Sequence, residues 1–139
     1  KDVDNIDSID ELVAAESLIC CVPTWNTGAD EARSGTAWDD LVQEIPDKDF
    51  AGKSVAIVGL GDSSGYSDFF CDAMEDLYTA FLQYGAKLIG KVSTEGYTYD
   101  DSKSIIDGKF CGLAIDEDNE SELTDQRLQA WVQQINAEA

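Results

Sequence analysis

The sequence predicts an α/β domain built around a parallel sheet. Short apolar runs alternate with longer segments of helical periodicity, which is the pattern of a sheet whose strands are connected by helices. The principal apolar runs show no alternation with polar residues, as expected for strands covered on both faces. With 139 residues and 43% hydrophobic content, the chain matches a common domain size, so we expect a single domain over residues 1–139.

Four apolar segments are the candidate strands. The first, residues 17–22, is a continuous apolar run that we expect to be buried on both faces. The second, residues 54–59, leads directly into a glycine-rich segment. Residues 86–90 form a third strand, and residues 109–115 form a fourth piece that Gly112 interrupts. Because helical segments separate these strands, we expect them to pair in parallel.

Two amphipathic helices are predicted by apolar residues at helical spacing. The first ends at Gly85, and its stripe consists of Phe70, Met74, Leu77, Tyr78, Phe81 and Leu82. The second begins near Thr124, a suitable N-cap, and its stripe consists of Leu128, Trp131, Val132 and Ile135. Residues 7–15 and 38–45 predict two shorter helices. We interpret the aromatic and methionine side chains of both stripes as core residues.

The charge and composition exclude several classes of function. Nine Lys and Arg residues against 29 Asp and Glu residues give a net charge of −20. We therefore expect no binding to nucleic acid or to an anionic membrane, since both require a basic surface. The chain contains no His, which excludes imidazole bases, His-dependent catalytic triads and His-ligated zinc. The longest apolar stretch is too short for a bilayer, so we expect no membrane insertion.

The four cysteines are not arranged as a metal or redox motif. They are Cys20, Cys21, Cys71 and Cys111, and no pair has Cys-x-x-Cys spacing. A chain of this length does not need disulfides to fold. We therefore expect free thiols that pack as small apolar residues in a reducing compartment.

Two segments follow strands at the edge where open parallel sheets bind their ligands. Residues 23–28 place Trp25 among Thr, Asn and Gly, and residues 61–70 place Tyr66 among Gly, Ser and Asp. One aromatic side chain on each of two neighbouring loops can sandwich a flat ring, and such stacking contributes about 0.5–1.5 kcal/mol beyond area burial. The alternative is that Trp25 and Tyr66 only cover the end of the sheet.

Three motifs, in this order along the chain, resemble the flavodoxin family. They lie in residues 23–28, 61–73 and 112–119. Residues 95–110 are similar to the insertion that splits the fifth strand of long-chain flavodoxins from cyanobacteria and algae. Residues 27–38, which include Arg33-Ser34-Gly35-Thr36, are most similar to eukaryotic algal members. This resemblance covers nearly the whole chain and implies a flavodoxin-like, doubly wound parallel sheet of strand order 2-1-3-4-5.

The resemblance implies a low-potential, one-electron carrier with non-covalently bound FMN, and not an enzyme. Trp25 and Tyr66 would stack on the two faces of the isoalloxazine, and the Asn26–Thr27 peptide would lie beside flavin N5. Gly61 and Asp62 would bind the pyrimidine edge of the ring. The complete set of cofactor-binding residues that it implies is Thr24, Trp25, Asn26, Thr27, Gly28, Leu60, Gly61, Asp62, Tyr66, Phe69, Phe70, Cys71 and Asp118. It implies no catalytic residue and no metal site.

If the similarity to algal members holds, photosystem I would be the electron donor and ferredoxin–NADP reductase the acceptor. The protein would then be located in the chloroplast stroma, and we expect it to be a monomer. The cyanobacterial or bacterial cytoplasm is the alternative location. Other functions remain open: a phospho-receiver-type interaction domain with Asp62 as acceptor, a cofactorless interaction domain of the same fold, or an FMN domain of a larger reductase. The glycines and Tyr66 around Asp62 favour a flavin loop over a receiver site.

The sequence departs from the family pattern in three places. Phe69 stands where the family usually has Asn, and residues 92–94 contain no aromatic residue where some relatives have one. The family's first strand and its phosphate-binding loop at a helix N-terminus have no counterpart in this sequence. We therefore expect about 30–35 further N-terminal residues, the length that a strand-helix-strand unit needs. In the chain as it stands, the strand at residues 17–22 would have an unpaired edge.

Overall fold

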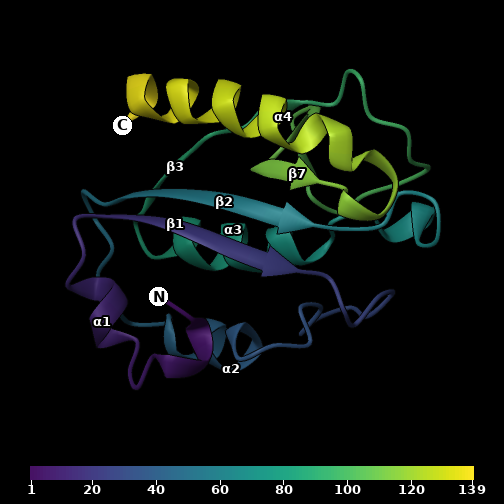
Figure 1. The fold of residues 1–139 in the computed structure, drawn as a ribbon. Helices are drawn as coiled ribbons and strands as arrows, with labels where there is room; N and C mark the ends of the chain where they lie inside the picture. Colours follow the sequence, from purple (N-terminus) through teal and green to yellow (C-terminus); the bar gives the residue numbers. More distant parts are fainter.

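The computed structural model describes residues 1–139, in which helices cover both faces of a parallel sheet (Figure 1). The sheet contains β1 (Ser17–Pro23), β2 (Ser54–Leu60), β3 (Lys87–Ile89) and β7 (Leu113–Ile115), and all its strand pairs are parallel. Its order is β1-β2-β3, and β7 also pairs with β2. This arrangement confirms the predicted α/β class. In the expected order 2-1-3-4-5, β1 corresponds to strand 3, β2 to strand 4, and β3 together with β7 to strand 5.

β3 and β7 are two halves of one interrupted strand. Both lie on the same side of β2: β3 pairs with it up to the Ala56–Ile89 pair, and β7 pairs with it from the Val58–Leu113 pair onward. The residues between them leave the sheet and form a small antiparallel unit of β4 (Val92–Ser93), β6 (Lys109–Phe110) and β5 (Ile105–Ile106). The predicted fourth piece is therefore divided, because β6 belongs to this unit and only β7 belongs to the main sheet.

Gly112 stands where the chain returns to the sheet. A Cβ atom at this position would overlap the carbonyl oxygen of Ile57 in β2. Because no other residue type lets the two backbones approach so closely, glycine is required here. The interruption of the apolar run by Gly112 therefore marks the junction between the antiparallel unit and β7.

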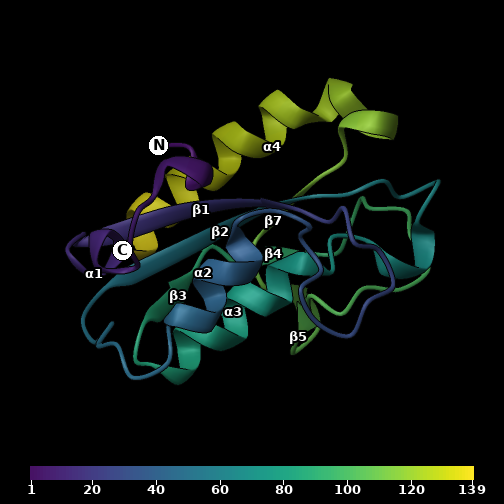
Figure 2. The same ribbon diagram turned by 90° about the horizontal axis from the view of Figure 1, so that it is seen from below.

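The helices form one layer on each face of the sheet. α1 (Asp10–Val13), α2 (Trp38–Glu44) and α3 (Ala73–Gln83) lie on one side, and α4 (Glu117–Glu138) lies on the other (Figures 1 and 2). Two short 3₁₀ helices cover Val3–Asn5 and Ser67–Phe69. The larger core fills the space between the sheet and α2 and α3, and the smaller one lies under α4, where Trp131 and Ile135 pack against the sheet. No helix is both long enough and apolar enough to span a membrane.

Three details of the predicted helices were wrong. Phe70 is buried but precedes α3, and Leu82 and Val132 are 50% and 46% exposed, so the apolar stripes are narrower than predicted. α4 begins at Glu117 and not near Thr124, because the side chain of Asp116 caps it by accepting a hydrogen bond from the Asn119 N–H. A non-helical conformation at Glu120 separates this first turn from the regular part of the helix.

β1 is an edge strand and is buried on one face only. Cys20 and Val22 point into the core on the α2–α3 side, whereas Ile19 is 59% exposed and Cys21 is exposed on the other face. The prediction of burial on both faces is therefore wrong for this strand, because α4 packs over β7 and not over β1. All four cysteines are free, as predicted, and burial raises the pKa of the Cys20 thiol to about 12.

Candidate functional site

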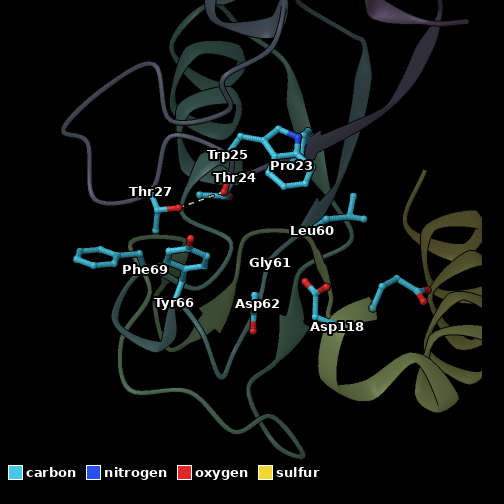
Figure 3. A pocket seen from close by; sticks show the side chains of 11 residues that line it. Pro23, Thr24, Trp25, Thr27, Leu60, Gly61, Asp62, Tyr66, Phe69 and Asp118 are labelled. Atoms are coloured by element: carbon cyan, nitrogen blue, oxygen red, sulfur yellow. Dashed lines mark hydrogen bonds between the residues drawn. The ribbon is translucent and has the colours of Figure 1, made fainter.

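A cavity of about 410 Å³ lies at the carboxyl ends of β1 and β2, at the edge of the sheet that the sequence indicated (Figure 3). Two loops form most of its wall: the first connects β1 to α2 (residues 24–37), and the second connects β2 to α3 (residues 61–72). The start of α4 completes it. The residues that line it are Pro23, Thr24, Trp25, Thr27, Leu60, Gly61, Asp62, Tyr66, Phe69, Glu117 and Asp118.

Most of the residues proposed from the sequence meet at this cavity, and four do not line it. Asn26 and Gly28 lie in the first loop without lining the cavity, and Phe70 and Cys71, at the end of the second loop, are buried in the core. Pro23 and Glu117 line the cavity although sequence reasoning did not select them. Both could have been selected from their positions in the sequence, because Pro23 ends β1 and Glu117 directly precedes Asp118.

The aromatic side chains of the site are unusually exposed. Trp25 is 76% exposed and Tyr66 is 54% exposed, and they come from different loops on opposite sides of the cavity (Figure 3). A tryptophan that only covered the end of the sheet would pack most of its surface against the protein. Trp25 does not, so the structure disagrees with that alternative. Exposed aromatic surface around a cavity is typical of a binding site for an apolar or planar ligand.

Two main-chain hydrogen bonds hold the two sides of the first loop together. The Trp25 N–H donates to the carbonyl of Ser34, and the Asn26 N–H donates to the carbonyl of Arg33. Gly35 allows this close approach, because a Cβ atom there would lie 3.0 Å from the Cβ atom of Trp25. Asn26 itself does not adopt a positive φ angle, whereas Gly28 does, at 81°. Gly35, with a φ angle of 66°, is the other glycine of this loop in the left-handed region.

The second loop is organised by the carboxylate of Asp62. It accepts hydrogen bonds from the N–H groups of Ser64 (3.1 Å) and Gly65 (2.8 Å) and from the side-chain amide of Asn119 (2.7 Å). These donors, the Gly65 N–H first, lower the pKa of Asp62 below its usual value. Asp62 therefore stays ionised, and its charge lies at the wall of the cavity.

Asp116 connects the second loop to the start of α4. It is fully buried, and it accepts hydrogen bonds from the hydroxyl of Ser63 and from the main-chain and side-chain N–H groups of Asn119. Sequence reasoning missed this role of Asp116 and Asn119, although an Asp followed three residues later by a polar residue is a recognisable helix start. Oxygen atoms of Asp62, Asp116 and Asp118 lie within 4.8 Å of one another, but the first two are already bound by protein donors.

The second loop is supported from beneath by residues 100–104 of the segment between β4 and β5. The N–H groups of Asp100 and Asp101 both donate to the carbonyl of Ser67. Hydroxyl groups continue this pattern, since Ser102 donates to the carbonyl of Phe70 and Ser104 donates to the carbonyl of Cys71. The insertion therefore fixes residues 67–71 without lining the cavity.

Asp72 is a buried carboxylate next to this support. One of its oxygens accepts the Lys103 N–H at 2.8 Å, and the other is buried without a partner. Desolvation raises the pKa of Asp72, and the Lys103 N–H and the charge of Arg33 offset this only in part. The charged form of Asp72 therefore lowers the stability of the folded protein.

This carboxylate predicts a pH dependence of stability. Folding raises the pKa of Asp72 above its usual 3.8, so protonation of Asp72 stabilises the folded protein. This contribution is fully present below pH 3.8 and is lost as the pH rises through the raised pKa of the folded state. We expect Asp72→Asn to reduce this loss, as measured by urea unfolding from about pH 4 to about pH 8. Asp125→Asn, at an exposed carboxylate, is the control. An unchanged pH profile for Asp72→Asn would contradict the prediction.

Comparison with known proteins identifies the family of this site. The sequence profile described as Flavodoxin matches residues 1–131. The chain belongs to the flavodoxin family. A flavodoxin from Nostoc sp. is 49% identical over 87% of this chain and 69% of its own length, and one from Picosynechococcus sp. is 46% identical over 96% of this chain and 76% of its own length.

Solved structures agree with this assignment. The crystal structure of Fusobacterium nucleatum flavodoxin bound to flavin mononucleotide aligns with a TM-score of 0.85 and 35% identity, and the alignment covers 97% of this chain and 77% of that chain. The predictions of a flavodoxin and of a flavodoxin-like fold are therefore confirmed. Flavodoxins are FMN-dependent electron carriers and not enzymes, as the sequence analysis expected.

Proposed function

We propose that this chain carries single electrons on FMN that is bound, without a covalent link, in the cavity at the ends of β1 and β2. The observation that carries this proposal is the pair of exposed aromatic side chains, Trp25 and Tyr66, on two separate loops around one cavity of about 410 Å³. Ligand pockets of this kind are concave and mainly apolar, with a few polar groups that fix the orientation of the ligand. When bound, FMN supplies the one-electron chemistry.

The residues around the cavity fit a planar ring with one polar edge. Trp25 and Tyr66 would stack against the ring, and the main chain at Gly61 and Asp62 would bind its polar edge. Asp118 would lie near the ribityl chain, and the Asn26–Thr27 peptide would reach the ring from the first loop. The other residues assigned to the site are Thr24, Gly28, Leu60 and Phe69, which would complete the wall, and Phe70 and Cys71, which would support it from the core.

Phe69 contributes apolar surface where the family usually has Asn. Its ring atoms lie 3.6–3.8 Å from the position that a Cβ atom of Gly28 would occupy, so the two loops approach each other at this point. We propose that Phe69 fixes the spacing of the loops by packing, in place of a polar contact.

Carboxylates at the wall of the cavity oppose negative charge inside it. Asp62, Glu117 and Asp118 all line the cavity, and Asp62 is held ionised by its hydrogen bonds. Two like charges about 4 Å apart repel by roughly 4 kcal/mol at an effective dielectric constant of 20, and the repulsion declines with distance. These groups therefore favour the release of an electron from a reduced cofactor, which gives a low potential.

We further propose photosystem I as electron donor and ferredoxin–NADP reductase as acceptor, in the chloroplast stroma. The 49% identity to a cyanobacterial flavodoxin supports the choice of photosynthetic partners, and the similarity of residues 27–38 to algal members supports the choice of the stroma. A net charge of −20 would attract basic docking surfaces on both partners. Transient kinetics with the purified partners test this, since the association rates should fall as salt rises. Rates that are negligible, or independent of salt, would contradict it.

The cofactor proposal is tested by adding FMN to the purified protein. We expect flavin absorption bands that remain with the protein through gel filtration, strong quenching of flavin fluorescence, and two resolved one-electron steps in a reductive titration. Riboflavin in place of FMN measures the contribution of the phosphate. A protein that takes up neither flavin would contradict the proposal and would favour an interaction domain that has the fold without the cofactor.

A further inference from the structure

Arg33 is a buried arginine in the first loop to which the proposed function assigns no role. Its side chain is only 8% exposed, although it carries a full charge and lies in a loop between β1 and α2. A buried guanidinium is costly unless its donors are bound and its charge is neutralised. Its contacts therefore indicate what it holds in place.

The guanidinium joins the loop to the first turn of α3. Within the loop, Nε donates to the carbonyl of Ala29 (3.0 Å) and Nη2 donates to the carbonyl of Asp30 (2.7 Å). Toward α3, Nη1 lies 2.7 Å from a carboxylate oxygen of Glu75 and 3.3 Å from one of Asp76. These two carboxylates neutralise the guanidinium, and α3 is one of the most deeply buried helices of the protein.

The main chain of Arg33 also joins α3 to Asn26, which lies on the cavity side of the loop. Its N–H donates to Asp76 at 3.1 Å, and its carbonyl accepts the Asn26 N–H at 3.0 Å. The side chain of Asn26 donates to the carbonyl of Ala32, which adopts a φ angle of +52°. A non-glycine residue in this conformation requires support from its surroundings, and the side chain of Asn26 supplies one such contact.

Beyond the N–H group of Asn26, the hydrogen bonds of this loop become long. The carbonyl of Asn26 accepts only a long bond from the Ala29 N–H (3.4 Å), and the hydroxyl of Thr27 makes a bond of 3.5 Å. Gly28 follows, with a φ angle of +81°. Arg33 therefore restrains the loop as far as Asn26, and no short hydrogen bond restrains the main chain of the next two residues.

We propose that Arg33 is a positioning residue that holds Asn26 against α3 and so fixes where the Asn26–Thr27 peptide lies relative to the cofactor. This inference rests on the proposed function for its effect on the flavin. The restraint itself is a property of the protein alone. Loss of the restraint should change the separation of the two one-electron potentials, because the peptide would no longer be held at a fixed position beside the ring.

The test compares Arg33→Met with Arg127→Met. Arg127 is the only other arginine of the chain. It binds α4 to the segment at Gly96 through a hydrogen bond and a contact with the Tyr97 ring, and it forms an ion pair with Glu120 within α4. Both variants lose one partly or fully buried guanidinium, but only Arg33 contacts the first loop. Glu75→Gln is a milder variant that keeps Arg33 and removes one charge partner, in case Arg33→Met does not fold.

Hydrogen exchange of the protein without FMN gives the first readout. Because hydrogen bonds to charged groups are worth about 1.5–3 kcal/mol, we expect the Trp25 and Asn26 amides to exchange roughly 10- to 100-fold faster in Arg33→Met. A smaller increase is expected in Glu75→Gln, and none in Arg127→Met. Unchanged exchange in both Arg33→Met and Glu75→Gln, or equal acceleration in Arg127→Met, would overturn the proposal.

The second readout is the separation of the two one-electron midpoint potentials with FMN bound. It should change in Arg33→Met and Glu75→Gln and stay constant in Arg127→Met, even if all three variants lose stability. A changed exchange rate with an unchanged separation would overturn the effect on the cofactor. A wild-type protein that binds no FMN would contradict the proposed function, while the exchange experiment would still decide whether Arg33 fixes Asn26.

Discussion

Replacing Trp25 with alanine is expected to weaken FMN binding roughly 150- to 1,000-fold while leaving the stability of the protein nearly unchanged. Trp25 is 76% exposed, so the fold loses little buried surface when it is removed. A ligand that covers about 100 Å² of the indole gains about 2.5 kcal/mol from burial and about 0.5–1.5 kcal/mol from stacking. The measurements are fluorescence titration with FMN and urea unfolding of the protein without FMN.

Two variants serve as controls for this result. Trp25→Phe keeps an aromatic ring and should retain part of the affinity. Leu82→Ala removes another exposed apolar side chain, which lies on α3 away from the cavity, and should bind FMN as the wild type does. If Trp25→Ala bound FMN with wild-type affinity, Trp25 would not contact the cofactor, and the position proposed for the ring would be wrong.

Replacing Gly61 with alanine is expected to disrupt the second loop and to cost about 1–3 kcal/mol of stability. A Cβ atom at this position would lie 2.8 Å from both the main-chain nitrogen and the sulfur of Cys71, which is closer than such contacts occur. The main-chain nitrogen cannot move aside as a side chain could. Gly61 also donates its N–H to the carbonyl of Ile115 at 3.1 Å, so a displacement moves the loop away from β7.

Gly108→Ala is the control, because it should lower the stability of the protein without crowding the cavity. Gly108 has a φ angle of +81°, and no neighbouring atom lies within 4 Å of the position that a Cβ atom would occupy. Alanine there therefore costs about 1–2 kcal/mol through backbone strain alone. We expect Gly61→Ala to lower FMN affinity at least about tenfold and Gly108→Ala to leave it unchanged, at a comparable loss in urea stability. Equal affinities in the two variants would show that Gly61 is not needed for the shape of the site.

The parts of the structure that could be predicted from the sequence depend on local patterns. The runs that became β1 and β2 are apolar enough to specify strands, and the glycines and small polar residues after them specify loops. Because parallel strands end at one edge, these loops had to meet, and the structure places Trp25 and Tyr66 around one cavity.

The parts that could not be predicted depend on contacts between distant segments. The exposure of Ile19 follows from where α4 packs, which the sequence of β1 does not contain. Thr124 has the propensity of an N-cap, but Asp116 begins α4 earlier because its position beside Ser63 and Asn119 supplies partners for its carboxylate. Arg33 occupies a polar segment that is typical of an exposed loop, and only the fold brings Glu75 and Asp76 beside it.

The support of the second loop by residues 100–104 has a consequence for how the protein opens. Hydrogen bonds join this segment to the main chain of Ser67, Phe70 and Cys71, whereas neither segment belongs to the central sheet. Segments that share their hydrogen bonds in this way exchange and unfold together, as a cooperative unit within the larger protein. We therefore expect the wall that carries Tyr66 to lose its order together with the insertion.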